Sequence, residues 1–366
     1  CRSCSMGDRR PVNALSKALR SDAGRGLTLV SPALIYALLL LAAPLAVIVL
    51  FSFWTQNFLT IERVFTLENY RTALTDPLYA TLMQRSISIA GLVTAVTVIL
   101  AFPVAYYISF YVRPERKSLW LFLITIPFWT SYLIRVFLWR VILAFDGPVN
   151  GTLMGFGVID QPLPWLLYNA TAVVITLAHA FAPFAILPIF VALEKIDRSL
   201  LEASRDLGES PAMTFLRVTL PLAMPGVLAA VLIVFIPTVG DYVTPRLVGG
   251  SGGTMIANMI YAQIFDLNDR PMGATLAVLA MTIVALTLIW AISRVRLWLW
   301  LGGRISGRAR LLVLAAPVAE IALIGWVIGQ GPAIFGPIPA LLALAGAVLI
   351  SSAAILFSVP RGRFGV

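Results

Sequence analysis

The sequence has 366 residues, of which 60% are hydrophobic and 12% charged, and its mean hydropathy is +0.92. This composition excludes an ordinary soluble domain and indicates a protein of the lipid bilayer. The formal net charge of +10 does not indicate nucleic-acid binding, because the basic residues lie in short segments beside apolar runs. We therefore expect membrane lipid around the chain and no nucleic-acid partner.

Apolar runs long enough to cross a bilayer recur along the chain. A membrane-spanning helix needs about 20 mostly apolar residues, and roughly eight stretches meet this requirement. Their length and continuity exclude the short alternating strands of a membrane β-barrel. The sequence therefore predicts an all-α integral membrane protein. The predicted spans lie near residues 29–51, 87–111, 119–143, 170–192, 225–248, 273–292, 311–329 and 338–358.

Basic residues predict the orientation of these spans. The segment before the first run and the connections after the second, fourth and sixth runs are rich in Lys and Arg. Residues 144–169, between the third and fourth runs, contain Asp146 and Asp160 but no basic residue. Because Lys and Arg accumulate on the cytoplasmic side, we expect a cytoplasmic amino terminus and a cytoplasmic connection at about 194–224.

This connection begins with a pattern typical of a short helix. Asp197 or Ser199 can cap its amino-terminal end, and Gly208 is a natural stop. Between them, apolar and small residues recur at helical spacing. These residues are Leu200, Leu201, Ala203, Ser204 and Leu207.

A second short helix is predicted directly after Gly208. Ser210 can act as its N-cap, with Pro211 at the first helical position and the helix continuing through Arg217. We expect Pro221 and Pro225 to end it before the next span. Two short cytoplasmic helices, each with one apolar face, indicate a surface that docks against a partner.

The same connection carries a recognisable motif. It reads Glu202-Ala203-Ser204-Arg205-Asp206-Leu207-Gly208 and, nine residues later, Val218-Thr219-Leu220-Pro221. It resembles the EAA signature of permease subunits of bacterial ATP-binding-cassette (ABC) importers, with Ser204 replacing the second alanine and Val218 replacing isoleucine. The resemblance implies that the loop couples the permease to a cytoplasmic ATPase. The coupling residues that it implies are Glu202, Ala203, Ser204, Asp206, Gly208, Leu220 and Pro221.

Flanking segments at 206–211, 219–222 and 235–243 resemble the spermidine/putrescine (polyamine) permease group, over a region from about residue 29 to 296. Permeases for ferric iron, opines and other small solutes share much of this pattern, so they remain alternatives. The resemblance implies a MetI-like type I permease core of six spans. On this basis residues 1–28 are a cytoplasmic segment, 29–300 the permease domain and 301–366 an extension with two further candidate spans.

Asp241 is the most informative charge, because an ionisable group inside a span is expensive. We expect it toward the external end of span five, where its carboxylate could attract a cationic polyamine. Alternatively, Arg135 lies at similar depth in span three and could form a buried ion pair with it. Asp241, Tyr242 and Arg135 are therefore our candidate residues of the translocation path.

Two other classes of protein, an intramembrane protease and a secondary transporter, fit the sequence less well. An intramembrane protease would use Ser251 and His179, but Ser251 falls in an external glycine-rich loop with no base in an obvious motif nearby. A secondary transporter would leave the EAA-like loop unexplained.

The chain also lacks the Gly-x-x-x-x-Gly-Lys-Ser/Thr motif of nucleotide-binding loops. We therefore expect no cofactor in this chain and no enzymatic activity of its own, with ATP and Mg held by a separate ATPase. The resemblance implies four kinds of neighbour in the bacterial inner membrane. They are a second permease subunit, a dimer of cytoplasmic ATP-binding subunits, an extracytoplasmic solute-binding protein and lipid.

Overall fold

The computed structural model describes residues 22–58 and 60–301. It divides into two compact units, Cys1–Phe51 and Ser52–Val366. The first contains helix α2 (Asp22–Phe51), whose stretch Leu29–Phe51 is long and apolar enough to cross a membrane, as predicted. The candidate spans at 311–329 and 338–358 lie outside the described residues.

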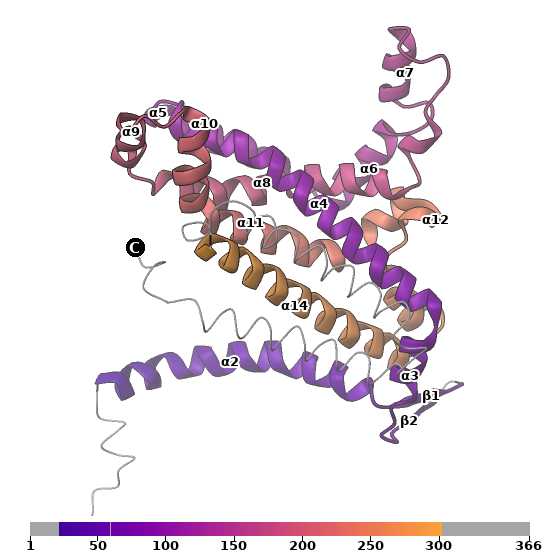
Figure 1. Cartoon of the computed structure of the whole chain (residues 1–366). Coiled ribbons are helices and arrows are strands. Elements are labelled where there is room, and N and C mark those ends of the chain that lie inside the picture. Colours follow the sequence, from indigo (N-terminus) through magenta and orange to yellow (C-terminus); the bar gives the residue numbers. More distant parts are fainter. Residues whose placement is uncertain (1–21, 59, 302–366) are drawn as a thin grey trace, which may run out of the picture. The chain divides into compact units, whose positions relative to one another are not determined.

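The second unit is built almost wholly from helices, drawn in Figure 1. A small hairpin of β1 (Thr55–Asn57) and β2 (Thr60–Glu62) precedes them, paired in antiparallel fashion. The α-helices are α3 (Glu68–Thr75), α4 (Pro77–Phe110), α5 (Pro114–Thr125), α6 (Tyr132–Ile142), α7 (Pro148–Gly155), α8 (Ala170–Glu194), α9 (Arg198–Asp206), α10 (Pro211–Thr214), α11 (Leu220–Val239), α12 (Gly250–Gly253), α13 (Ile256–Tyr261) and α14 (Arg270–Leu301). Single turns of other helix types are the 3-10 helices η1 (Ile126–Trp129) and η2 (Pro164–Leu166) and the π-helices η3 (Phe215–Thr219), η4 (Pro245–Gly249) and η5 (Ala262–Asp266).

Across the described part of the chain, 5 helices are long and apolar enough to cross a membrane, or 6 if one bent pair counts as a single span. The prediction of an all-α membrane protein with a six-span core is therefore confirmed. The second span begins at Pro77, earlier than predicted. Asp76 caps it by accepting a hydrogen bond from the Leu78 amide at 2.8 Å, and Pro77 occupies the first turn, where its missing N–H has no consequence.

The third span is broken, and the prediction of one continuous helix at 119–143 is wrong. Its two halves, Pro114–Trp129 and Tyr132–Ile142, meet at 86°. Pro127 lies in the last turn before the break and cannot donate a backbone hydrogen bond, and Thr130 is extended, with φ −83° and ψ 147°. A single run of apolar residues therefore forms two helices with different directions.

The fifth span also differs from its prediction. Pro221 and Pro225 do not end the preceding helix, because η3 leads directly into α11, which begins at Leu220. Pro221 follows the π-helical turn η3 in the first turn of α11, and Pro225 is accommodated inside the helix. α11 ends at Val239, so Asp241 lies just beyond the helix and not within it.

The core forms where α4, α8 and α11 pack against one another, with fully buried side chains such as Val93, Leu177 and Val234. α11 approaches α8 closely at Gly226, where an added Cβ would lie 2.5 Å from the Ala192 Cβ atom. A second cluster joins α4, α11 and α14. Figure 1 shows that α5, α9 and α10 gather at one end of α4, whereas α3 lies at the other.

Candidate functional site

The EAA-like segment folds into a protrusion of two short helices, which we call the coupling protrusion (residues 198–219). Its first helix, α9, is capped by Asp197, whose Oδ1 accepts from the Ser199 amide at 3.0 Å. This hydrogen bond holds the pKa of the Asp197 carboxyl below its usual range. α9 stops where Gly208 adopts φ +83°, a left-handed conformation that residues with a Cβ rarely take. The predicted first helix and its glycine stop are confirmed.

Side-chain contacts fasten the second helix to the first. Ser210 caps α10 by accepting from the Met213 amide at 3.3 Å, as predicted. Ser204 and Thr214 share a buried hydrogen bond of 3.0 Å between their hydroxyls, and Arg217 forms an ion pair with Glu209. Ser204, one of the two departures from the EAA signature, thus helps to join the two helices.

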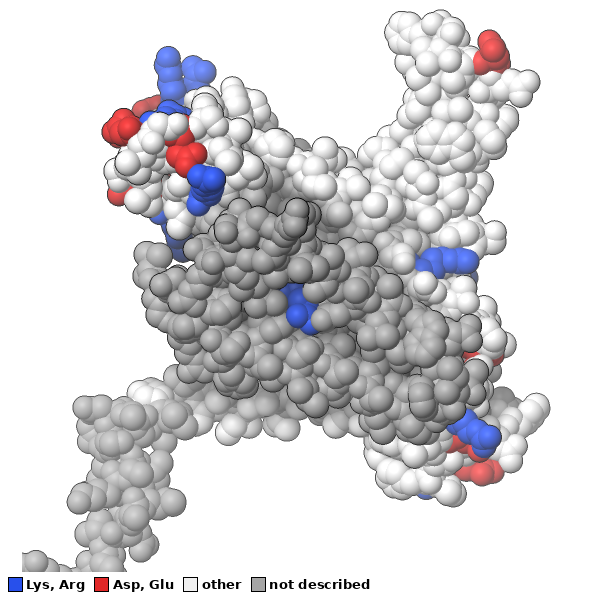
Figure 2. Space-filling view, viewed as in Figure 1, with Lys and Arg blue, Asp and Glu red and all other residues white. Residues whose placement is uncertain are grey.

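The outer surface of the protrusion is apolar as well as charged. Leu200 and Ala203 on α9 and Leu207 directly after it recur at helical spacing and are exposed, Leu207 to 86%. Glu202 and Asp206 are also exposed, and Figure 2 shows charged side chains gathered at the end where α9 and α10 lie. Of the other predicted coupling residues, Gly208 is exposed, Ser204 is buried, and Leu220 and Pro221 are half-buried at the start of α11.

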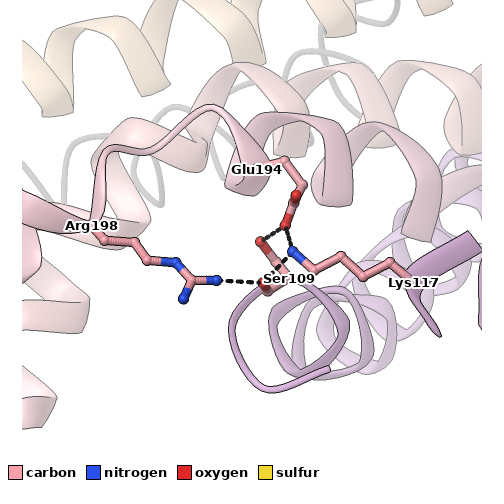
Figure 3. Close-up of polar contacts among 4 residues, drawn as sticks. All are labelled: Ser109, Lys117, Glu194 and Arg198. Carbon is pink, nitrogen blue, oxygen red and sulfur yellow. Dashed lines mark hydrogen bonds and ion pairs between the residues drawn. The ribbon is translucent and has the colours of Figure 1, made fainter. Parts of the chain in front are cut away.

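Behind the protrusion, four residues form a polar junction, drawn in Figure 3: Ser109, Lys117, Glu194 and Arg198. The Lys117 ammonium donates to Glu194 Oε1 at 2.6 Å and to the Ser109 carbonyl at 2.8 Å. The Ser109 hydroxyl donates to the same Glu194 oxygen at 2.7 Å, and Arg198 donates to the Ser109 carbonyl at 3.5 Å. The sequence analysis counted Lys117 and Arg198 only as topology charges and gave no role to Ser109 or Glu194. The available signal was a pair of opposite charges at the ends of neighbouring predicted spans.

Asp241 lies at the second helix break, between α11 and η4. Its Oδ2 accepts from the Tyr132 hydroxyl at 2.6 Å, and its Oδ1 accepts from the Val243 and Thr244 amides at 2.9 and 3.4 Å. The Tyr132 hydroxyl also lies 2.6 Å from the Thr244 hydroxyl. Because Tyr132 is the first residue of α6, one carboxylate joins the break in span three to the break after α11.

Arg135 does not pair with Asp241, so the ion-pair alternative is wrong; the ion pairs among residues 60–301 do not include these two side chains. Arg135 is 7% exposed and donates to the carbonyls of Thr130 at 3.1 Å and Ala180 at 3.2 Å, while its Nε has no partner. The predicted ion pair assumed that Arg135 and Asp241 lie at similar depth in the membrane in two straight helices. The bend at Thr130 removes that basis and turns Arg135 toward the carbonyl freed by the break.

Tyr242 belongs to a different surface from Asp241. Its ring stacks on Tyr261 with 5.0 Å between centroids, and Arg246 lies over the Tyr261 ring at 5.0 Å. These residues line a cavity of about 320 Å³ together with Asp266. The three predicted path residues, Asp241, Tyr242 and Arg135, therefore face three different sets of partners.

The residues of the rival protease reading have separate partners. His179 Nδ1 accepts from the Trp139 indole at 3.1 Å, whereas the Ser251 carbonyl accepts from Arg85 at 2.8 Å. In the portion of the chain that is described, no group of three or more His, Cys, Asp and Glu side chains is arranged to hold a metal ion.

Sequence comparison gives consistent matches. Residues 98–299 match the family described as binding-protein-dependent transport system inner membrane component. The spermidine/putrescine transport system permease protein PotB of Escherichia coli (strain K12) is 37% identical over 236 residues, covering 64% of this chain and 85% of that protein. PotB of Haemophilus influenzae is 36% identical, covering 63% and 79%. The inner membrane ABC transporter permease protein YdcU of Escherichia coli is 35% identical, covering 61% and 74%.

Solved structures share the fold. A chain of a bacterial ABC transporter involved in the import of the acidic polysaccharide alginate matches with a TM-score of 0.59 and 15% identity, covering 76% of this chain and 96% of that one. A chain of the bacterial alginate transporter in complex with a periplasmic protein matches with a TM-score of 0.58 at the same identity. At this identity the likeness describes the arrangement of helices and not the substrate.

Proposed function

We propose, from the premise that this chain belongs to the family of binding-protein-dependent transport system inner membrane components, that it moves polyamines such as spermidine and putrescine into the cytoplasm. As a member of that family it is a permease subunit of an ABC transporter. Polyamines are favoured by the relatives that carry spermidine and putrescine in their names, of which this chain covers 85% and 79%. Ferric iron and opines are the alternatives.

The exposed coupling protrusion is the observation that supports coupling to an ATPase. Leu207 is 86% exposed at its tip, and burying a leucine side chain favours association by about 1.5–3 kcal/mol. In our proposal a dimer of cytoplasmic ATP-binding subunits covers this tip and contacts Glu202, Ala203, Asp206 and Gly208. Ser204 holds the two helices together, and Leu220 and Pro221 connect them to α11.

The proposed assembly places this chain beside a second permease subunit in the bacterial inner membrane, with its amino terminus in the cytoplasm. An extracytoplasmic solute-binding protein delivers substrate from outside. ATP and Mg are bound by the partner ATPase and not by this chain. ATP binding closes the ATPase dimer and moves the coupling protrusion, which opens the path outward, and hydrolysis resets it.

Asp241 is our proposed contact for the cationic substrate. It follows the carboxyl end of α11, where unpaired carbonyls carry partial negative charge, and its carboxylate adds a full charge. Transporters commonly bind ions where membrane helices are interrupted, and here two interruptions meet through Tyr132 and Asp241. An arriving ammonium group would compete with the Tyr132 hydroxyl for this carboxylate.

Uptake of radiolabelled spermidine and putrescine tests the proposed function. Cells lacking this chain are compared with cells in which the chain is restored together with its ATPase and binding-protein partners. Restored uptake is the expected result. Assembly with the ATPase but no polyamine uptake would contradict the substrate and favour the iron or opine alternative.

Asp241→Asn should lower spermidine uptake by about tenfold or more, because it removes the charge. Its single amide oxygen can still accept from the Val243 amide, while its NH2 group replaces the oxygen that accepts from Tyr132. Tyr132→Phe is the matched control, since it removes the hydrogen bond and keeps the charge. We expect it to retain clearly more uptake than Asp241→Asn, because the charge that attracts the substrate remains. Rates are measured for spermidine and for a mono-acetylated polyamine of lower charge, for which the loss in Asp241→Asn should be smaller. Equal losses in both variants and for both substrates would assign Asp241 a purely structural role.

A further inference from the structure

The proposed ATPase coupling assigns no role to the polar junction. It gathers residues from the last turn of α4, the first turn of α5, the end of α8 and the start of α9 (Figure 3). We propose that this junction transmits displacement of the coupling protrusion to α5, so that Lys117 and Glu194 are positioning residues for transport. This inference rests on the proposed ATPase coupling and does not depend on which substrate is carried.

The contacts of the junction are hydrogen bonds to two shared acceptors. One oxygen of Glu194 accepts from both Lys117 and Ser109, and the Ser109 carbonyl accepts from both Lys117 and Arg198. That carbonyl belongs to the last turn of α4, where it has no partner within the helix and where cations are favoured by the helix dipole. The two cations therefore bind the end of α4 from α5 and from α9.

The connection between α8 and α9 is stiff. Residues 195–197 join these helices, Ile196 within them is buried, and its amide donates to the Leu193 carbonyl at 3.1 Å. A displaced α9 must therefore move Glu194 with it. Lys117, whose side chain is 13% exposed, then carries the displacement to α5.

α5 leads to the break in span three. α5 continues through η1 to the 86° break, and the residue that starts α6 after the break, Tyr132, donates to Asp241. A shift of α5 therefore acts on the proposed substrate contact. The Lys117–Glu194 pair is partly solvent-exposed, and such pairs add little stability. A weak, charge-selective contact suits a joint that changes between states of the cycle.

The test uses the full assembly in proteoliposomes and measures substrate transported per ATP hydrolysed. Lys117→Gln and Glu194→Gln should lower this ratio severalfold while ATP hydrolysis continues, at the low end of typical coupling effects because the pair is partly exposed. The charge exchange Lys117→Glu with Glu194→Lys should recover part of the ratio. Lys195→Gln is the matched control, since Lys195 is exposed on the same connection and lies outside the junction. An unchanged ratio, or parallel loss of transport and hydrolysis, would overturn the proposal.

A second measurement needs neither substrate nor partner. In the purified full-length chain, Glu194→Gln should increase amide hydrogen exchange in the first two turns of α5, whereas Lys195→Gln should not. Unchanged exchange in α5 would overturn the junction's role even if polyamine uptake is confirmed. Increased exchange would support the junction even if the wild-type assembly transports a different solute.

Discussion

Replacing Gly226 with leucine is expected to destabilise the chain by about 3 kcal/mol, because there is no space for a side chain where α11 crosses α8. A Cβ at this position would lie 2.5 Å from the Ala192 Cβ and 2.5 Å from the Pro188 carbonyl oxygen. The carbonyl belongs to the α8 backbone and cannot turn aside as a flexible side chain could. The two helices must separate, and the core around Leu177 and Val234 opens with them.

The measurement is thermal unfolding of the detergent-purified chain, supported by the monodisperse fraction in size-exclusion chromatography. Gly91→Leu on α4 is the matched control, because nothing lies within 4 Å of a Cβ at Gly91 and leucine is a good helix former. We expect Gly91→Leu to remain near wild type. Equal stability of the two variants would contradict the close packing of α8 and α11.

The sequence predicted best what depends on local chemistry. The cap at Asp197, the left-handed stop at Gly208 and the cap at Ser210 each follow from residues close in the chain, so the coupling protrusion could be outlined before any coordinates. The apolar runs likewise located the spans, because the length of a bilayer-crossing helix is fixed by the bilayer.

The helix breaks that the sequence did not predict depend on how the helices pack in space. Pro127 and Pro225 are both prolines inside apolar runs, yet the chain breaks just after Pro127 and continues as a helix through Pro225. The difference comes from tertiary packing, since α11 is held against α8 and α4, whereas α6 turns away to meet η4. Helix propensity alone cannot distinguish these two cases.

The same limitation explains the wrong partner for Asp241. Counting residues along straight helices placed Arg135 opposite the carboxylate, but the break between Trp129 and Tyr132 brings Tyr132 there. The polar junction was missed for a related reason, because Lys117 and Glu194 are 77 positions apart and meet only when α4, α5 and α8 pack. Long-range polar contacts are properties of the fold, so opposite charges at the ends of predicted spans indicate candidate pairs but do not establish the contact.

Gly208→Val is expected to reduce uptake about tenfold while leaving membrane insertion unchanged. The residue adopts φ +83°, and a left-handed conformation costs a residue with a Cβ about 1–2 kcal/mol, at the high end for a β-branched side chain. Since each 1.36 kcal/mol is a factor of ten in an equilibrium, the population of correctly formed protrusions falls accordingly. Insertion depends on the apolar spans and not on this turn, so the amount of chain in the membrane fraction should stay constant.

Gly208→Asn separates the turn from the bulk of the new side chain. Asparagine tolerates the left-handed region, and nothing in the chain lies within 4 Å of a Cβ at this position, so the protrusion should still form. Uptake and ATP hydrolysis are measured for both variants at matched membrane levels. If Gly208→Asn transports well and Gly208→Val does not, the backbone conformation of the turn is what the coupling requires. Equal loss would instead indicate that the proposed contact of the ATPase with Gly208 leaves no room for a side chain, and normal uptake by Gly208→Val would contradict docking through this protrusion.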